Sequence, residues 1–228
     1  MHHGIKKLLL LGAGHAHVHV LARLAQHHPA DLDVTVLTPY AFQSYSGMVP
    51  GFVAGHYSDA DCQIPLAPLL KAAGARWITG RCIGIDARSR QVLMAPASDP
   101  APVADSLDYD LLSIDTGAVM DLQRLEAVMP GASEHALMVR PIEIFVRLWP
   151  QVMEMAQKKA VSVAMIGAGA AGIELVLAAH QRLTSLRGPG SRFTLITGGD
   201  DAAANYPPGV RERILRQLKA RGITVLRE

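Results

Sequence analysis

Two short glycine-rich motifs in this sequence have the residue types and the spacing that nucleotide phosphates require. Residues 167–172 read GAGAAG, a complete GxGxxG pattern, and residues 12–17 read GAGHAH, in which His17 stands at the position of the third glycine. In such a pattern the first glycine permits a tight turn, the second lets the backbone approach a pyrophosphate, and the third allows a helix to pack closely on a strand. The alternative for either motif is a tight turn with a purely structural role.

Three histidines at the first motif raise the question of a metal site. His15 and His19 would share one face of a helix, while His17 would point away from them. Because no nearby carboxylate completes a ligand set, we expect no metal here, and histidines that are solvated or lie close to a phosphate are the favoured interpretation. A histidine in place of the third glycine also predicts slightly looser packing between helix and strand.

Neither motif is followed by the acidic residue that usually ends the second strand and holds a ribose hydroxyl. Thr38 and Thr197 stand at those positions, and Asp200 and Asp201 lie just behind the latter. A threonine hydroxyl can make a hydrogen bond but cannot hold a diol as a carboxylate does. Since Arg192 precedes its strand and is poorly placed for a 2′-phosphate, the choice between NAD and NADP stays open.

The elements that position the first motif form a strand–helix–strand unit of about thirty residues. Residues 5–11 are an apolar run typical of a buried parallel strand, and the apolar spacing over 18–25 predicts a helix that Pro29 stops. Residues 33–38 (DVTVLT) predict the second strand. The long stretch 40–61 is rich in Gly, Ser and aromatic residues, and we expect an irregular, functional loop there.

The segment between the two motifs predicts a short helix at 66–70 and a series of short strands. The strands are expected at residues 76–79, 82–86, 91–94 and 109–114. A polar, proline-bearing turn is expected at 99–106.

The second half repeats the opening pattern, which is much stronger support for nucleotide binding than a single motif. A strand, a helix and a second strand are predicted at residues 161–166, 170–183 and 193–197. Before them we expect a helix over 142–158 that is interrupted at Pro150. After them, Pro207-Pro208 predicts the start of a further helix that Gly222 ends, followed by a strand at 223–226.

Composition and charge narrow the function classes. Half of the residues are hydrophobic, 18% are charged and the formal net charge is +2, without a Lys/Arg run that would follow a nucleic-acid backbone, so we expect no nucleic-acid partner. Cys62 and Cys82 form no CxxC pair, which excludes a disulfide framework and favours a cytoplasmic location. The apolar stretch 161–179 approaches the length of a membrane span, but its three glycines and Glu174 favour a strand–turn–helix.

These patterns predict an α/β fold with two Rossmann-like units that have parallel sheets, and a small antiparallel β crossover segment. We expect a first dinucleotide-binding domain at residues 1–120, a crossing segment at 121–145 and a second dinucleotide-binding domain at 146–228.

Several stretches resemble a known family. The two glycine motifs, with residues 109–117 (YDLLSIDTG) between them, look like the pyridine nucleotide–disulfide oxidoreductase superfamily, in which the Thr-Gly at the end of that strand lies against FAD. Residues 14–18 (GHAHV) and 45–57 (YSGMVPGFVAGHY) are similar to one subgroup. That subgroup is related to type II NADH dehydrogenases and sulfide:quinone oxidoreductases, and in some bacteria it is fused to selenide water dikinases. The resemblance covers essentially the whole chain.

This resemblance implies FAD on the first domain and NAD(H) or NADP(H) on the second. The residues that would border FAD are Gly12, Gly14, His15, Ala16, His17, Thr38, Pro39, Ser46, Gly47, Met48, Cys82, Thr116 and Gly117. Those that would hold the nicotinamide dinucleotide are Gly167, Gly169, Ala171 and Gly172. Glu174 matches a glutamate near the nicotinamide–flavin junction and is the catalytic candidate; the alternative is a helix residue paired with a neighbour.

Two departures from the family pattern matter. The paired redox cysteines are absent, with residues 44–51 (SYSGMVPG) in their region, so we expect no dithiol chemistry and interpret Cys62 and Cys82 as small buried residues. Relatives return from the nicotinamide domain to finish the FAD site with a Gly-Asp motif, whereas this sequence ends at Glu228. We therefore expect a missing C-terminal segment that would carry the closing FAD residues and any dimer or membrane contact.

The expected function is transfer of a hydride from NAD(P)H to FAD and then of electrons to a quinone or another small acceptor. The cysteine content favours a cytoplasmic protein, and we expect no transmembrane segment, peripheral membrane attachment in the full-length form, and either a homodimer or a missing C-terminal segment. Two alternatives stay open. One is a non-catalytic dinucleotide-binding or regulatory module, or a fragment; the other is a flavoenzyme that acts on sulfur or selenium species and needs a reactive cysteine.

Overall fold

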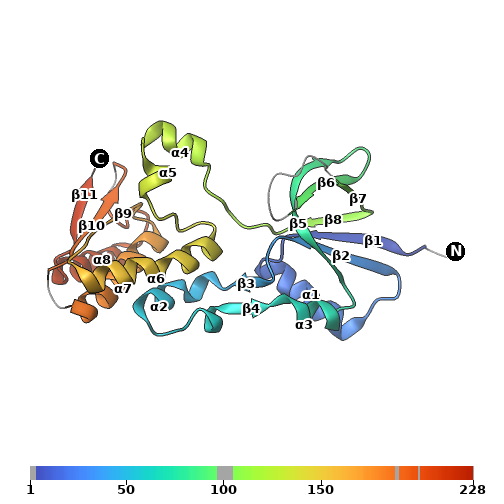
Figure 1. The fold of residues 1–228 in the computed structure, drawn as a ribbon, viewed down its shortest axis with the longest axis horizontal. Coiled ribbons are helices and arrows are strands. Elements are labelled where there is room, and N and C mark those ends of the chain that lie inside the picture. Colours follow the sequence, from blue (N-terminus) through green and yellow to red (C-terminus); the bar gives the residue numbers. More distant parts are fainter. Residues whose placement is uncertain (1–3, 97–104, 188–189, 200, 228) are drawn as a thin grey trace. The chain divides into compact units, whose positions relative to one another are not determined.

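The computed structural model describes residues 4–96, 105–187, 190–199 and 201–227, and the chain forms two compact units. The first unit comprises Met1–Tyr45 and Gln63–Asp121, and the second comprises Ser46–Cys62 and Leu122–Glu228. Figure 1 labels the helices and strands of both units.

The first unit is built on a six-stranded sheet with the order β7-β6-β5-β2-β1-β8. Its parallel part pairs β1 (Lys6–Leu11) with β2 (Leu32–Thr38) and β8 (Leu111–Ile114), and β2 with the start of β5 (Arg76–Asp86). The second half of β5 continues into an antiparallel ribbon with β6 (Gln91–Pro96) and β7 (Asp105–Asp108). This mixed sheet confirms the predicted α/β class with a small antiparallel segment.

β5 is one strand, although the sequence predicted two strands with a break near residue 80. Its register with β6 shifts between Cys82 and Gly84, so a bulge absorbs the irregularity without ending the strand. β8 begins two residues later than predicted, and of the expected turn at 99–106, residues 97–104 lie outside the described residues while Asp105 and Ser106 belong to β7.

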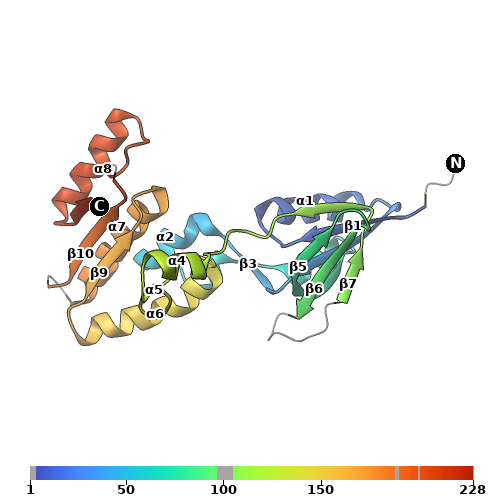
Figure 2. The same cartoon turned by 90° about the horizontal axis from the view of Figure 1, so that it is seen from above.

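The three leucines at the end of β1 explain how the first unit is layered. Leu9, Leu10 and Leu11 are all about 1% exposed, and alternate residues of a strand point to opposite faces. Leu10 packs with residues of α1 (His15–His27) and α3 (Leu66–Ala72), whereas Leu9 and Leu11 pack with Val92 of β6. Helices therefore cover one face of the parallel strands, as α1 does in Figure 2, and the antiparallel ribbon covers part of the other.

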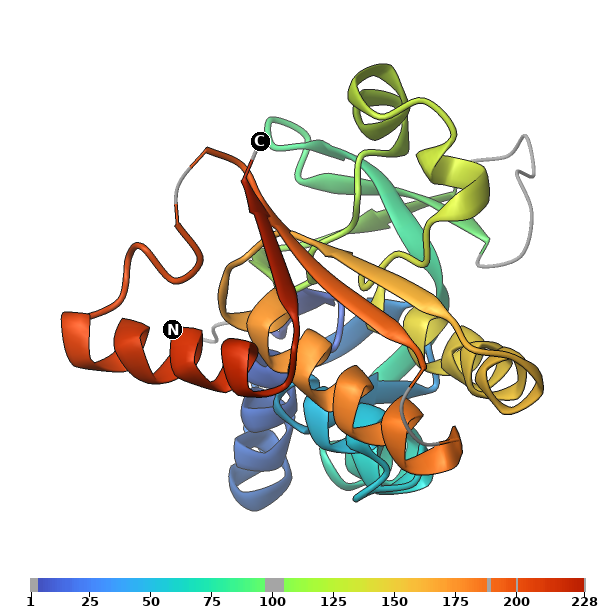
Figure 3. The same cartoon turned by 90° about the vertical axis from the view of Figure 1, so that its left-hand side faces the viewer.

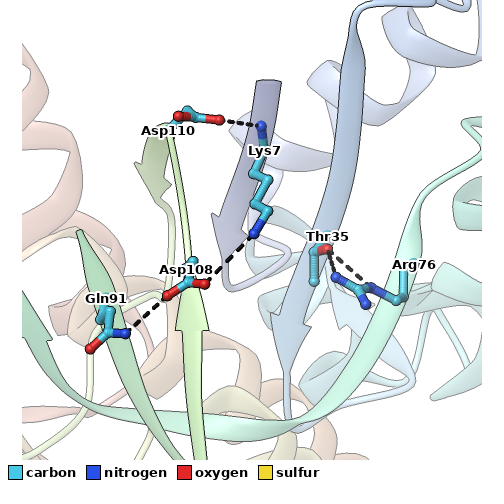
Figure 4. A network of polar contacts seen from close by, with 6 residues as sticks. All are labelled: Lys7, Thr35, Arg76, Gln91, Asp108 and Asp110. Carbon is cyan, nitrogen blue, oxygen red and sulfur yellow. Dashed lines mark hydrogen bonds and ion pairs between the residues drawn. The ribbon is translucent and has the colours of Figure 1, made fainter. Parts of the chain in front are cut away.

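Polar contacts tie the strands of the first unit together near the starts of β1 and β8 (Figure 4). The backbone N–H of Lys7 donates to the carboxylate of Asp110 at 2.9 Å, and its ammonium lies 3.6 Å from Asp108. Gln91 donates a second bond to Asp108 at 3.0 Å, and its hydrogen bond is the main cause that lowers the pKa of this carboxyl group. These contacts lie near the amino ends of the parallel strands β1 and β8, away from the glycine motif that follows the carboxyl end of β1.

The second unit contains a three-stranded parallel sheet with the order β11-β10-β9. Its strands are β9 (Ser162–Ile166), β10 (Arg192–Thr197) and β11 (Thr224–Arg227), and its long helices are α6 (Ile142–Lys158), α7 (Ala170–Arg187) and α8 (Pro208–Ala220). Figure 3 faces this unit and shows the three strands side by side. One core joins Val176 and Leu183 of α7, Leu195 of β10 and Leu218 of α8. The predicted strand–turn–helix over 161–179 is confirmed.

The stretch 40–61 is more ordered than predicted. β3 (Phe42–Ser44) pairs with β4 (Gln63–Pro65) in the first unit, and between them η1 (Ser46–Met48), α2 (Val49–Ala54) and η2 (Ala60–Cys62) belong to the second. The expectation of an irregular loop is wrong because its proline and glycine act as helix signals: Pro50 lies in the first turn of α2, and Gly55 ends it in the left-handed region at φ +84°.

The second correction concerns Pro150, which does not interrupt α6. The helix continues through it because its apolar face is buried on both sides, by Phe145 and Trp149 before the proline and by Ala156 after it. The two aromatic rings stack with centroids 6.0 Å apart. The crossing segment before α6 contains α4 (Leu122–Val128) and α5 (Ala132–His135). Among the described residues, none of the helices has both the length and the apolar character needed to cross a membrane.

Candidate dinucleotide-binding sites

The turn of the first motif is held between β2 and β8. The N–H of Gly12 donates to the carbonyl of Leu37 at 2.8 Å, and its φ of +80° lies in the region that favours glycine. A Cβ at position 12 would collide with the backbone of Asp115, so no side chain fits there. The motif is thus a close crossing of two backbones, as its first glycine predicted.

His17 replaces the third glycine with a buried polar contact. Its side chain is about 1% exposed, with Nδ1 2.8 Å from the carbonyl oxygen of Gly12 and Nε2 2.9 Å from the hydroxyl of Ser113. Because a carbonyl only accepts, Nδ1 donates to Gly12, and the Ser113 hydroxyl is the partner of Nε2. His17 is therefore buried and not solvated, whereas His15 and His19 are exposed. The other expected role of these histidines, close to a phosphate, stays a prediction.

The carboxylate of Asp115 accepts one of the N–H groups in the first turn of α1. The sequence alone did not identify Asp115 as a site residue. Its carboxylate accepts from the N–H of His17 at 3.0 Å, and its backbone carbonyl accepts from Gly14 at 3.2 Å. A Cβ on Gly14 would collide with this carboxylate. Within the described residues, the N–H groups of His15 and Ala16 have no partner, so they are the donors that the helix can offer to an anion.

The carboxyl ends of β1, β2 and β8 bring together most of the predicted FAD residues of the first unit. Thr116 and Gly117 follow β8, and Gly117, at φ +77°, has open space around it. Thr38 ends β2, with Pro39 directly behind it, but the threonine is buried and its hydroxyl accepts a long 3.4 Å bond from the N–H of Tyr40. The side chain that stands in for the ribose-binding acid is therefore turned into the protein.

The two cysteines differ in their surroundings. Cys62 is buried in the second unit, and desolvation, followed by the charges of Asp59 and Asp61, raises the pKa of its thiol. Cys82 is half-buried on β5, and its thiol lies 3.6 Å from the carbonyl of Gly84. Because buried, protonated thiols are poor nucleophiles, the surroundings of Cys62 do not favour nucleophilic attack by its sulfur.

Three residues expected beside the flavin belong to the second unit. Ser46, Gly47 and Met48 form η1; the first two are exposed and Met48 is half-buried. The structure therefore groups them with α2 and α7, and does not join them to the first motif within one unit.

The second motif has the geometry that its three glycines predict. Gly167 has φ +102°, and its N–H donates to Ile196 at 2.9 Å. A Cβ on Gly172 would collide with the carbonyl of Gly167, whereas a Cβ on Gly167 or Gly169 would meet no atom within 4 Å. The third glycine therefore serves packing, and the first two border open space.

The start of α7 offers an anion site beside that open space. The N–H groups of Ala170, Ala171 and Gly172 have no backbone partner within the described part of the chain, and the helix dipole adds partial positive charge. Glu174 follows on the same helix, is exposed, and makes no hydrogen bond or ion pair with a described residue. The alternative expectation, that Glu174 pairs with a neighbouring residue, is therefore not seen among the described residues.

A sequence model of the pyridine nucleotide-disulphide oxidoreductases matches residues 6–228. The chain belongs to this family. Among curated relatives, this family member is 24% identical over 232 residues to demethylphylloquinone reductase NdbB of Synechocystis sp., covering 96% of this chain and 53% of NdbB. It is also 24% identical over 193 residues to an external alternative NAD(P)H-ubiquinone oxidoreductase B4 of Arabidopsis thaliana, covering 78% of this chain and 32% of that protein.

Two solved structures show the same fold. NDH2 from Plasmodium falciparum in complex with NADH aligns with a TM-score of 0.78 at 16% identity, over 97% of this chain and 48% of that one. The sulfide:quinone oxidoreductase from Aquifex aeolicus aligns with a TM-score of 0.75 at 18% identity, over 97% of this chain and 51% of that one. This family member thus spans about half the length of NdbB and of both structures.

Proposed function

We propose that this chain binds FAD through its first unit and NAD(P)H through its second, and takes part in the transfer of a hydride from the nicotinamide to the flavin and of electrons on to a quinone. The main support is the geometry of the second motif, where Gly172 packs against the turn while Gly167 and Gly169 border open space. The quinone is proposed because NdbB and the Arabidopsis relative are named for quinone substrates.

The residues of the second motif fit a pyrophosphate. A phosphate needs space close to the backbone and N–H donors that are not already used. Gly167 and Gly169 supply the space, and the first turn of α7 supplies the donors. Neither a lysine nor an arginine is needed at this turn, because the helix N-terminus provides the positive potential.

The first motif offers fewer unused N–H donors to FAD than the second motif offers to NAD(P)H. The N–H groups of His15 and Ala16 remain for a phosphate, while Asp115 takes the N–H of His17. Thr116 and Gly117 are exposed at the same edge of the sheet, where they can border a bound cofactor. Pro39 and Cys82 are proposed for the adenosine side, and Ser46, Gly47 and Met48 for the flavin.

When bound, FAD supplies the redox chemistry: it accepts a hydride and returns electrons to an acceptor. The task of the chain is to bind and orient, and no side chain needs to act as a nucleophile. We place Glu174 near the nicotinamide, because it is an exposed carboxylate on α7 just after the glycine motif. Its proposed role is to position the nicotinamide ring. We also propose a cytoplasmic protein that attaches peripherally to a membrane and forms a homodimer.

The test follows flavin absorbance in the purified chain. We expect bound flavin, bleaching of its visible band when NADH or NADPH is added without oxygen, and recovery of the band when a short-chain quinone is added. Gly169→Ala is the matched control, because its methyl group meets no protein atom yet fills the space proposed for the phosphate. Absence of both bound flavin and bleaching would refute the proposal.

A second candidate is a dinucleotide-binding module without turnover, because the open space and unused N–H donors of the second motif account for binding but not for hydride transfer. Such a module would be stabilised against heat by NAD(P)H, since a ligand that binds only the native state raises apparent stability. It would show no bleaching of flavin. The flavoenzyme for sulfur or selenium species has less support, because Cys62 is buried with a raised thiol pKa.

A further inference from the structure

An ion-pair cluster lies beyond the carboxyl ends of β10 and β11 in the second unit. The carboxylate of Asp201 pairs through one oxygen with the guanidinium of Arg211 and through the other with that of Arg227. Asp201 follows β10, Arg211 lies in the first turn of α8, and Arg227 is the last residue of β11. Arg227 pairs in register with Thr197, the last residue of β10. Three separate elements thus bring one carboxylate and two guanidinium groups to one edge of the sheet.

This edge is where the adenosine ribose of a dinucleotide would lie. In a Rossmann unit the pyrophosphate sits at the helix after the first strand, and the ribose hydroxyls lie beyond the end of the second strand. Here the glycine motif follows β9, and β10 is hydrogen-bonded beside it, with Ile196 opposite Ile166. Neighbouring strands are about 4.8 Å apart, so the cluster is separated from the glycine motif by one to two strand spacings.

The charges of the cluster favour a phosphate over a diol. A site for an unphosphorylated ribose uses a carboxylate whose oxygens are open to the two hydroxyls. The two oxygens of Asp201 instead pair with the two arginines, Oδ1 without a hydrogen bond to any described residue, and Thr197 at the end of β10 is buried. Two guanidinium groups and one carboxylate leave a net positive charge.

Donor capacity also remains in the cluster. Arginine has five N–H donors in a planar fork that matches phosphate oxygens. The side chain of Arg227 is 66% exposed, so a ligand can reach it. That of Arg211 is 37% exposed, but its Nε is buried without a hydrogen-bond partner among the described residues, so Arg227 supplies most of the donors that a ligand can reach. A ribose 2′-phosphate would bring two negative charges and several acceptor oxygens to these donors.

We propose that Arg211 and Arg227 recognise the 2′-phosphate of NADPH, so that this chain binds NADPH in preference to NADH. The preference rests on the proposed function, because it assumes that the second motif holds a nicotinamide dinucleotide. Asp201 orients the two guanidinium groups in the free protein, and its negative charge opposes the incoming phosphate. The carboxylate therefore sets how strong the preference is.

The test uses two redox-inactive probes, adenosine 2′,5′-bisphosphate and 5′-AMP, which differ only in the 2′-phosphate. Their dissociation constants are measured by calorimetry with the full chain. We expect the bisphosphate to bind at least tenfold more tightly than 5′-AMP. Arg227→Gln is expected to remove most of this ratio without changing the affinity for 5′-AMP, and Asp201→Asn is expected to raise it.

Two variants separate recognition from folding. Arg213→Gln changes an exposed arginine on the same helix, α8, and is expected to leave both affinities unchanged. Because the side chain of Arg227 is more exposed than that of Arg211, Arg227→Gln is the decisive variant. Its circular dichroism and melting temperature are first compared with those of the wild type. Equal affinity for both probes in the wild type, equal losses in Arg227→Gln, or no binding of either probe would overturn the inference.

Anaerobic flavin bleaching with NADH and with NADPH tells the two proposals apart. Bleaching at equal rates, with equal affinity for the probes, would overturn the 2′-phosphate preference and leave the proposed function intact. A clear preference for the bisphosphate without any bleaching would refute the proposed hydride transfer and support the phosphate site. Faster bleaching by NADPH, slowed selectively in Arg227→Gln, would support both.

Discussion

Replacing His17 by glycine would complete the GxGxxG pattern of the first motif, yet we expect it to destabilise the protein. The imidazole is buried and bridges the carbonyl of Gly12 and the hydroxyl of Ser113. Removing it leaves two polar groups without a partner, at a cost of about 1–3 kcal/mol each when buried. Since Ser113 is only half-buried, about 3 kcal/mol in total is a reasonable sum, and the cavity adds to it.

The loss is measurable because each unit contains one tryptophan. Trp77 packs against the core of the first unit, and Trp149 is buried in the second. In a Trp149→Phe background, the fluorescence of Trp77 therefore reports on the unit that contains His17. A loss of about 3 kcal/mol in a domain of this size lowers its melting temperature by roughly 10–20 °C.

The control is His19→Gly, which places glycine at an exposed position of the same helix. Its cost is the difference in helix propensity between histidine and glycine, about 0.3–0.5 kcal/mol, and this amount is subtracted from the effect of His17→Gly. His17→Ala should be less destabilising than His17→Gly by about 1 kcal/mol, the difference in helix propensity between alanine and glycine. If His17→Gly and His19→Gly unfold at the same urea concentration, the bridging role assigned to the imidazole is wrong.

Three further predictions concern other parts of the chain. Gly172→Ala should prevent the second unit from folding normally, because its methyl group meets the carbonyl of the turn, whereas Gly169→Ala should fold with an unchanged melting temperature and lose at least tenfold in affinity for NADPH. The carboxylate of Glu126 accepts hydrogen bonds from Ser133 and a nearby backbone N–H, which lower its pKa to about 2, so Glu126→Gln should loosen α4 and α5 at neutral pH. Because the folded-state pKa is depressed, the contribution of this carboxylate is present above about pH 4.5 and is lost as the pH falls toward 2, so hydrogen exchange in α4 and α5 of the variant and the wild type should converge there. Finally, Cys62→Ser and Cys82→Ser should both retain flavin reduction. A thiol reagent should label the half-buried Cys82 faster than the buried Cys62. Loss of activity in both variants would support the alternative of a flavoenzyme for sulfur or selenium species.

The parts of the fold that sequence patterns predicted are those whose signals are local. The apolar run of β1, the glycines that follow it and the β-branched residues of β2 each fix the backbone within a few positions, and their order repeats in β9, α7 and β10. The sequence does not predict α2, because proline and glycine are typical of loops, whereas here Pro50 and Gly55 mark the two ends of a helix. Pro150 was misjudged for the opposite reason, since the burial of α6 outweighs the local cost of the proline.

The site was predictable in its glycines but not in its polar contacts. His17 is 98 residues from Asp115 and 96 residues from Ser113, and only the pairing of β1 with β8 brings them together. Likewise, Asp201 was visible behind the second strand, but the two arginines that engage it depend on the start of α8 and on the register of β11. Contacts between segments that are distant in the sequence depend on the fold, and the spacing of residues within the motif does not predict them.

The placement of α2 in the second unit has a consequence for how the chain acquires its structure. Val49 and Val53 are buried in the same core as α7, which is synthesised roughly a hundred residues later. During translation the residues of α2 leave the ribosome before α7 is made. A six-residue helix has little stability of its own, so α2 is not expected to form until α7 is available for packing. A ribosome-bound chain stopped before residue 170 would therefore expose these valines, and protease protection of residues 46–62 should rise only once α7 has emerged.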